Sequence, residues 1–264
     1  MSLYMRFLLN AFLSKVAYKF DAYLGVISQC VFLFIHISIW KALYISAEIV
    51  DVSSIDLKTM ITYSVISAGI SLFINNSVIG IMDQKIRTGE IAIDLLRPMN
   101  LKTTLFYRKM GDTCFVMIFQ FLPVVMIFSF ILRINYPSIE FLLYFFITLI
   151  NGMIIYFLIT YIIGLIGFWY LSVWHLSRLL QDLVRLLSGS FIPLWFFPDI
   201  LSTISLYLPF RFIYFVPISI FLGKVDVLEI YIMIALQIMW ILILTIIEKV
   251  LWFKGIEKLV IQGG

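Results

Sequence analysis

Charged residues are scarce in this sequence, which has 19 Lys and Arg and 15 Asp and Glu among 264 residues. They make up 13% of the chain, whereas soluble domains carry about 25%. Hydrophobic residues make up 63%, and apolar runs of about 20 residues, long enough to cross a bilayer as helices, recur along the chain. The composition leaves no room for a sizeable water-soluble domain and predicts an integral membrane protein.

Cysteines and catalytic motifs are also nearly absent. Cys30 and Cys114 both fall in apolar runs, so they indicate neither a disulfide framework nor a metal site. No G-x-x-x-x-G-K-[ST] loop is present to bind ATP phosphates, and neither H-E-x-x-H nor G-x-S-x-G occurs. We therefore expect a chain that is not an enzyme and has no cofactor of its own; if ATP drives its function, ATP and Mg²⁺ would be bound by a partner subunit.

The hydropathy pattern predicts an all-α membrane protein with six transmembrane helices in a single domain, residues 1–264. The predicted spans are 24–45, 59–82, 112–132, 141–171, 179–197 and 228–250. If both termini are cytoplasmic, most of the 19 Lys and Arg lie on the inner side, as expected for a multi-pass protein of the inner or plasma membrane. No basic stripe or aromatic platform outside the spans predicts nucleic-acid binding.

The N-terminal segment, residues 1–22, is predicted to be an amphipathic helix. Its polar residues recur about one helical turn apart, at Arg6, Asn10, Ser14 and Lys19. Apolar residues fill the rest of the circumference, which is typical of a helix lying along the membrane surface in contact with lipids. It is either an anchor for the first span or a regulatory element.

A short charged segment, KIRTGEIAIDLLRPMN from Lys85 to Asn100, separates the second and third predicted spans. Its charges recur at helical spacing and predict one polar stripe, formed by Arg87, Glu90, Asp94 and Arg97. Apolar residues are expected on the other side, at Ile91, Leu95 and Leu96.

The ends of this helix are also predicted. Thr88 is expected to cap its start, Gly89 to let the backbone turn, and Pro98 to end it at about Arg97. The helix is either a simple interfacial loop or a docking element for a soluble partner, since polar contacts fix register and orientation.

Four of the seven prolines interrupt the apolar sequence before the last span. They are Pro193, Pro198, Pro209 and Pro217. Each piece between them is too short to cross the bilayer, so residues 193–224 are predicted to form re-entrant helices on the outer side. Asp199 and Arg211 are either an ion pair across this hairpin or two separate interfacial charges.

Three further patterns are candidate functional or packing faces. Ser64, Ser67, Ser71 and Asn75 share one face of the second span, and the small residues Gly152, Thr160, Gly164 and Gly167 form a face of the fourth. Such faces allow close helix packing, and the first could instead contact a transported cargo. A charged stripe at His175, Arg178, Asp182 and Arg185 suggests a second docking contact.

The run IRTGEIAIDLLRP resembles the motif that follows the second span in permease subunits of the ABC-2 family of ABC transporters. The form G-E-I-x-x-D-L-L-R-P is most similar to the subfamily of small permeases that lack a fused ATPase and are often encoded as pairs. The order of parts is also similar over nearly the whole chain: an amphipathic N-terminal helix, six spans, and a proline-broken stretch before the last span.

This resemblance implies an exporter permease that works with separate ABC ATPase subunits and a second permease, in a homodimer or heterodimer. The implied ATPase-coupling residues are Arg87, Gly89, Glu90, Asp94, Leu95, Leu96, Arg97 and Pro98, within a cytoplasmic segment at 83–110. The implied outer-gate residues are Pro193, Pro198, Asp199, Pro209 and Arg211. The cargo would be an antibiotic, peptide, lipid or other amphiphile.

Two other functions remain open from the sequence. One is a membrane scaffold or assembly protein without transport, in which the charged helix is only a partner dock. The other is an ion-coupled carrier, but the span centres lack the Asp and Glu relays expected of many such carriers.

Overall fold

The computed structural model describes residues 3–45, 55–74, 77–134, 136–170 and 172–263, which form helices and no β-strand. The α-helices are α1 (Leu3–Ala17), α2 (Lys19–Ile45), α3 (Leu57–Ser71), α4 (Ser77–Arg87), α5 (Glu90–Leu95), α6 (Leu101–Val116), α7 (Leu122–Leu132), α8 (Ile139–Leu165), α9 (Trp174–Leu187), α10 (Asp199–Tyr207), α11 (Phe215–Phe221) and α12 (Val227–Gly263). A π-helix, η1 (Met117–Phe121), and 3₁₀-helices η2 (Ile166–Phe168), η3 (Leu194–Phe196) and η4 (Pro209–Phe212) lie between them.

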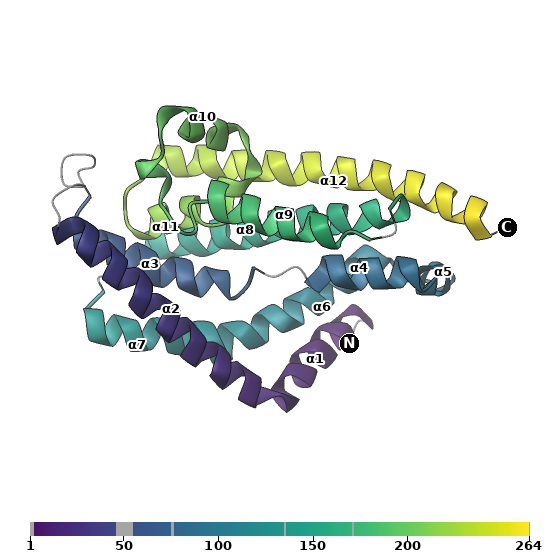
Figure 1. The fold of residues 1–264 in the computed structure, drawn as a ribbon, viewed down its shortest axis with the longest axis horizontal. Coiled ribbons are helices and arrows are strands. Elements are labelled where there is room, and N and C mark those ends of the chain that lie inside the picture. The colour runs from purple at the N-terminus through teal and green to yellow at the C-terminus, as the bar shows by residue number, and fades with distance from the viewer. Residues whose placement is uncertain (1–2, 46–54, 75–76, 135, 171, 264) are drawn as a thin grey trace.

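Helices α8 and α12 lie side by side along the longest axis of the molecule, whereas α2 runs obliquely to it (Figure 1). Helix α8 packs against α4, α11 and α12 and supplies much of the core. Helix α5 and the C-terminal end of α12 lie at one end of the bundle, and α10 lies toward the other (Figure 1). The charged α5 and the proline-rich segment are therefore at opposite ends, as expected for a helical membrane protein with two polar faces.

Four helices in the described ranges are long and apolar enough to cross a membrane, namely Ala22–Ile45, Leu101–Leu132, Ile139–Phe168 and Val227–Lys258. The predicted spans 24–45, 112–132 and 228–250 each lie within one of them, and 141–168 of the fourth predicted span lies in another. A bent pair, Asp199–Tyr207 with Pro209–Phe221, would make five, with an angle of 77° between its parts. The six-span topology is therefore only partly reproduced.

The predicted second span, 59–82, is not one continuous helix. Helix α3 ends at Ser71, and the N–H groups of Leu72 and Phe73 donate to carbonyls only three residues back, on Gly69 and Ile70. Helix α4 begins at Ser77. The sequence after α3 carries polar residues of low helix propensity within an apolar run. At about 1.5 Å per residue, neither helix alone spans the bilayer core of about 30 Å.

The predicted fifth span, 179–197, is also wrong as a single helix. Helix α9 starts earlier, at Trp174, and ends at Leu187. Gly189 has a φ of 78°, a left-handed conformation that Gly adopts at little cost and that stops a helix. The following η3 is a separate single turn that starts after Pro193.

Helix α1 packs directly against α6. A side chain at Gly111 of α6 would lie 2.2 Å from the Leu8 carbonyl oxygen of α1, so the two backbones are in contact. Tyr4 stacks on Tyr107 with ring centroids 5.5 Å apart. The N-terminal segment is a helix, as predicted, and is fixed to the base of the long α6–η1–α7 helix.

Two glycines of α8 allow similarly close contacts. A Cβ at Gly152 would lie 2.5 Å from the Phe212 carbonyl oxygen, and one at Gly164 would lie 2.7 Å from Cβ of Met82. The small-residue face predicted in the fourth span is therefore a packing face, against η4 on one side and α4 on the other.

The proline-rich segment consists of short helices, as predicted. Pro198 precedes α10, Pro209 is the first residue of η4, and Pro217 lies in the first turn of α11. Proline is tolerated at these positions because the first N–H groups of a helix have no partner within it. The prolines therefore set where each short helix begins.

Candidate functional site: a polar cavity and a charged helix

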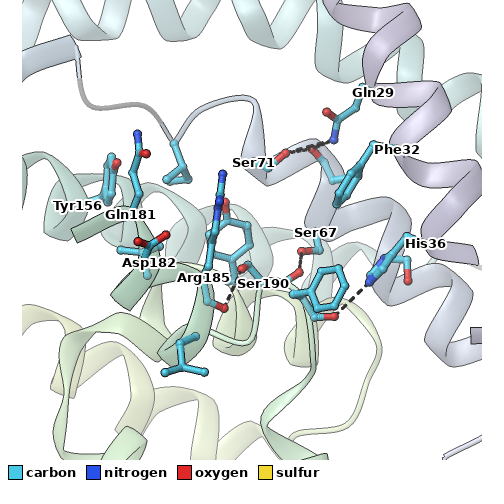
Figure 2. A pocket seen from close by; sticks show the side chains of 17 residues that line it. Gln29, Phe32, His36, Ser67, Ser71, Tyr156, Gln181, Asp182, Arg185 and Ser190 are labelled. Carbon is cyan, nitrogen blue, oxygen red and sulfur yellow. Dashed lines mark hydrogen bonds between the residues drawn. The ribbon is translucent and has the colours of Figure 1, made fainter. Parts of the chain in front are cut away.

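A cavity with a volume of about 720 Å³ lies among α2, α3, α9 and the turn after α9 (Figure 2). Ser64, Ser67 and Ser71 of α3 line it. Asn75, the fourth residue of the predicted face, lies outside the described residues. The polar face of the second predicted span therefore borders a cavity large enough for a drug-sized molecule.

The serine hydroxyls also hold this region together. Ser67 Oγ donates to the Ser190 carbonyl at 2.6 Å, which ties α3 to the turn after α9. Gln29 Nε2 of α2 donates to the Ala68 carbonyl at 2.8 Å and to Ser71 Oγ at 3.1 Å. The packing role is therefore present at Ser67 and Ser71, which also line the cavity, and the contact with a cargo stays a prediction.

Other lining residues come from elements that the sequence did not connect to this face. His36 of α2 contacts the Phe191 carbonyl through Nε2 at 3.2 Å, and its ring stacks on Phe32. Asp182 and Arg185 of α9 also line the cavity (Figure 2). The charged stripe of α9 was predicted as a second docking contact, which stays a prediction, and two of its members line the cavity. The sequence spacing of Asp182 and Arg185 predicts a charged face on α9, but the cavity that this face borders is visible only in the folded structure.

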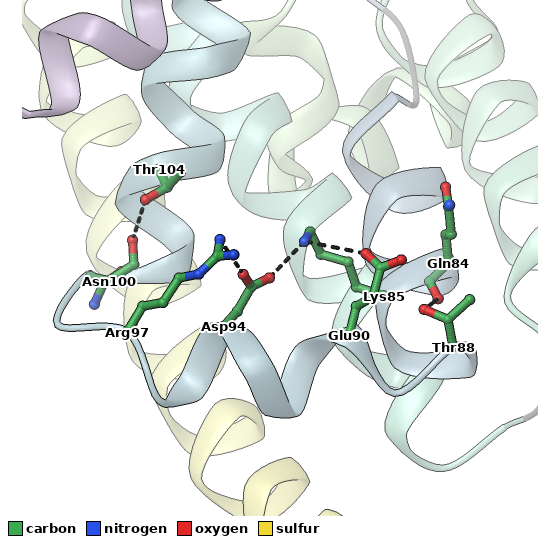
Figure 3. Close-up of polar contacts among 8 residues, drawn as sticks. All are labelled: Gln84, Lys85, Thr88, Glu90, Asp94, Arg97, Asn100 and Thr104. Atoms are coloured by element: carbon green, nitrogen blue, oxygen red, sulfur yellow. Dashed lines mark hydrogen bonds and ion pairs between the residues drawn. The ribbon is translucent and has the colours of Figure 1, made fainter.

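Helix α5 is held in place by ion pairs (Figure 3). The Asp94 carboxylate accepts from Lys85 Nζ of α4 at 2.6 Å and from Arg97 Nη1 at 3.2 Å. Glu90 is 3.8 Å from the same Lys85 ammonium. The Asp94 side chain is 11% exposed, whereas those of Glu90 and Arg97 are 50% and 57% exposed. Asp94 therefore braces α5 from inside, while Glu90 and Arg97 remain available to a partner.

The surface of α5 is partly apolar. Ile91 is fully buried, but Ile93 is 56% and Leu96 is 87% exposed. The predicted apolar side of this helix is thus divided, with Ile91 turned inward and Leu96 projecting outward. An apolar residue this exposed beside two accessible charges is the composition expected of a docking surface.

The turn before α5 and the bounds of this helix differ from the prediction. Gly89 has a φ of 75° and precedes α5, and a Cβ there would meet no atom within 4 Å. Thr88 does not cap α5, because its hydroxyl donates to the Gln84 carbonyl of α4 at 2.9 Å. Helix α5 ends at Leu95, before Pro98, and Arg87 belongs to α4. Gly89 alone makes the sharp turn between two separate helices.

Helix α4 also contacts the residue that precedes α9, the helix that lines the cavity. Asp83 Oδ1 accepts a hydrogen bond from the backbone N–H of Val173, the residue before α9, at 3.1 Å. Asp83 Oδ2 also pairs with Arg87 Nε at 3.6 Å. Helix α4 is therefore joined to α5 through Lys85 and to the start of α9 through Asp83.

The predicted outer-gate charges are not paired with each other. Asp199 is exposed at the start of α10, whereas Arg211 is 9% exposed in η4. The Arg211 guanidinium lies over the Phe212 ring at 4.9 Å from the ring centroid, and no ion pair joins it to Asp199. Pro193 and Pro209 are buried. The ion-pair alternative is wrong, and the two charges are separate.

The sequence profile of one family, described as ABC-2 family transporter protein, matches residues 26–263. The matched region runs from α2 to α12 and includes the cavity and the charged helix. No curated protein and no solved structure matches the chain.

Proposed function

Because the chain belongs to the ABC-2 family of transporter proteins, we propose that this permease is one subunit of an ATP-driven exporter whose ATPase is a separate protein. The sequence carries no P-loop motif of its own. ATP hydrolysis would then drive transport from outside this chain. The permease needs a surface that receives the movement and a cavity that responds to it.

The observation that carries the proposal is the construction of α5. Leu96 is 87% exposed, and the half-exposed Glu90 and Arg97 flank the same short helix. Apolar anchors within a polar rim are typical of protein interfaces. Asp94 fixes the helix to α4, so a force applied to α5 moves α4 instead of bending a loose loop. This end of the molecule would face the cytoplasm.

The cavity supports the pathway role. Asp182 and Arg185 are exposed on α9, within a protein whose long helices lie in a bilayer. A charged side chain facing lipid costs several kcal/mol, so such residues normally face water or protein. A second permease, either the same chain or a paralogue, would cover this face and close the cavity into a pathway between the two subunits. Its mixture of aromatic, hydroxyl, amide and charged groups suits an amphiphilic cargo.

The experiment is co-purification of the permease with its ATPase, together with the rate of ATP hydrolysis. The double variant Glu90→Ala/Arg97→Ala and the single variant Leu96→Ser should each reduce ATPase association by at least about tenfold, because hot-spot truncations cost about 2 kcal/mol or more. Arg133→Ala, at the C-terminal end of α7, is the control and should leave association unchanged.

Three results would contradict the proposal. Unchanged association in both α5 variants would remove α5 from the docking role. A membrane-impermeant thiol reagent that labels Leu96→Cys from outside intact cells, in a chain with Cys30 and Cys114 replaced by Ala, would place α5 on the wrong side of the membrane. Association without any effect on ATP hydrolysis would favour a scaffold.

A further inference from the structure

A second, smaller cavity of about 160 Å³ lies where α1, α4, α5 and α6 meet. Its charged lining residues are Lys85, Asp94, Arg97 and Arg108, and its apolar lining residues are Phe7, Met99, Leu101 and Leu105. We propose that this cavity binds the phosphate group of an anionic phospholipid. The proposal concerns a site separate from the cargo cavity, and it holds whether or not α5 docks an ATPase.

The charge of the lining favours an anion. Three cations and one carboxylate border the cavity, and the carboxylate, Asp94, is already engaged by Lys85 and Arg97. Arg108 forms no ion pair with any described carboxylate. Asp112 attracts it from a greater distance, but Lys15 and Lys109 act on the same carboxyl group. Positive charge is therefore left over at this junction.

The donors suit a phosphate in particular. A guanidinium carries five N–H donors in a planar fork, and Arg97 uses Nη1 for its contact with Asp94. Its other donors and the whole Arg108 guanidinium remain for an anion, and arginine binds phosphate oxygens in bidentate fashion. A cavity of 160 Å³ has room for several water molecules, and a single phosphate group can replace them.

The apolar part of the lining favours a lipid over a soluble phosphate. Phe7 of α1 and Leu101 and Leu105 of α6 form a wall beside the cations. On α1, Met5 is 41% and Leu9 is 37% exposed, which is the exposed apolar surface expected of a helix lying at the bilayer surface. Basic pockets beside transmembrane helices on the cytoplasmic side bind anionic headgroups. Phosphate and acyl chain would then meet the cations and the apolar wall of one site.

Native mass spectrometry of the full-length permease in detergent, titrated with phosphatidylglycerol or phosphatidylcholine, tests this site. We expect one phosphatidylglycerol to be retained in preference to phosphatidylcholine. Arg108→Gln should weaken its retention about tenfold or more, because a hydrogen bond to a charged group is lost. Arg97→Gln should act in the same direction. Arg108→Lys, which keeps the charge but not the fork, should give an intermediate loss and shows whether the fold tolerates a change there.

Arg87→Gln is the matched control. It removes the same charge at the same end of the molecule, and Arg87 is 57% exposed and does not line the cavity. Its retention of phosphatidylglycerol should stay within about twofold of the unmodified permease, since exposed charges contribute little.

Three outcomes would overturn the proposal. Equal losses in Arg87→Gln and Arg108→Gln would indicate general surface attraction without a site. Equal retention of phosphatidylcholine would remove the role of the headgroup charge. Displacement of phosphatidylglycerol by millimolar inorganic phosphate, with phosphate bound in its place, would indicate a soluble-anion site. Because no ATPase is present in this experiment, its failure leaves the docking role of α5 unaffected, and failure of docking leaves the lipid site unaffected.

Discussion

Replacing Asp94 by Asn tests whether α5 is a braced docking element. Asp94 lies between two cations, with Lys85 Nζ at 2.6 Å and Arg97 Nη1 at 3.2 Å. Asn has nearly the same size and shape but no charge, so the packing of α5 should survive while the attraction to both cations is lost. The substitution therefore separates bracing from packing.

The expected cost follows from the exposure of the three side chains. Breaking a fully buried ion pair costs about 3–5 kcal/mol, whereas an exposed pair contributes less than about 1 kcal/mol. Asp94 is 11% exposed, but Lys85 is 21% and Arg97 is 57% exposed. We therefore expect an intermediate cost of about 2 kcal/mol. Since about 1.4 kcal/mol corresponds to a factor of ten, α5 should detach from α4 about 30 times more often.

Hydrogen exchange of peptides covering residues 85–97 measures this detachment directly. In Asp94→Asn, exchange of the α5 amides should become about 30 times faster, and the dissociation constant for the ATPase should rise. Glu90→Gln is the control, because Glu90 is 50% exposed and lies 3.8 Å from Lys85. It should weaken ATPase binding without loosening α5. If exchange in Asp94→Asn is no faster than in Glu90→Gln, Asp94 does not brace this helix.

Three further predictions concern other parts of the fold. Gly89→Ala should destabilise the turn before α5 by about 1 kcal/mol. The cause is the φ of 75°, since an added Cβ would meet no atom within 4 Å. Co-purification should show reduced ATPase association of this variant, while its melting temperature stays normal. The Glu248 side chain is 6% exposed and lies 2.6 Å from the Lys102 ammonium. Lys102→Met leaves this carboxylate without its counter-ion and should lower the free energy of unfolding by about 3 kcal/mol. The double variant Lys102→Met/Glu248→Leu should recover most of that loss, and no recovery would show that the pair does not act as a unit. The hydrogen bond from Thr59 lowers the pKa of Asp56, so its stabilising effect is present at neutral pH and is lost as pH falls through this lowered pKa. Asp56→Ala should therefore cost about 1 kcal/mol at pH 7 and progressively less in acid, as melting curves in detergent at several pH values would show.

Local sequence signals predicted the positions of α5 and of the proline-rich helices. Gly89 and Pro98 mark a short charged segment because their backbone preferences act within a few residues. Pro198 and Pro209 mark helix starts for the same reason. These features need no knowledge of what the helices pack against, so one sequence is enough to find them.

Features that depend on distant partners were missed. The pairing of Lys85 with Asp94 crosses the turn at Gly89 and joins two helices, whereas the sequence suggested one continuous stripe. The end of α9 at Leu187 depends on a turn whose Gly189 carbonyl accepts from the Tyr63 hydroxyl at 2.6 Å. A hydropathy average taken over a window of residues does not detect such a turn, because the residues on both sides of it are apolar. The cavity was only half predicted, since α3 was expected to offer a polar face but α9 was not expected to complete it.

The scarcity of charge in this chain makes the placement of each charged group informative. An ion in or near a bilayer is costly unless protein, water or a counter-ion surrounds it, and α4 carries charges that meet this condition at two different places. Lys85 contacts α5 through Asp94, and Asp83 holds the backbone N–H of Val173 at the start of α9. Asp182 and Arg185 of helix α9 line the cavity. If α5 docks an ATPase as proposed, these polar contacts would connect a displacement of α5 through α4 to the helix that borders the cavity.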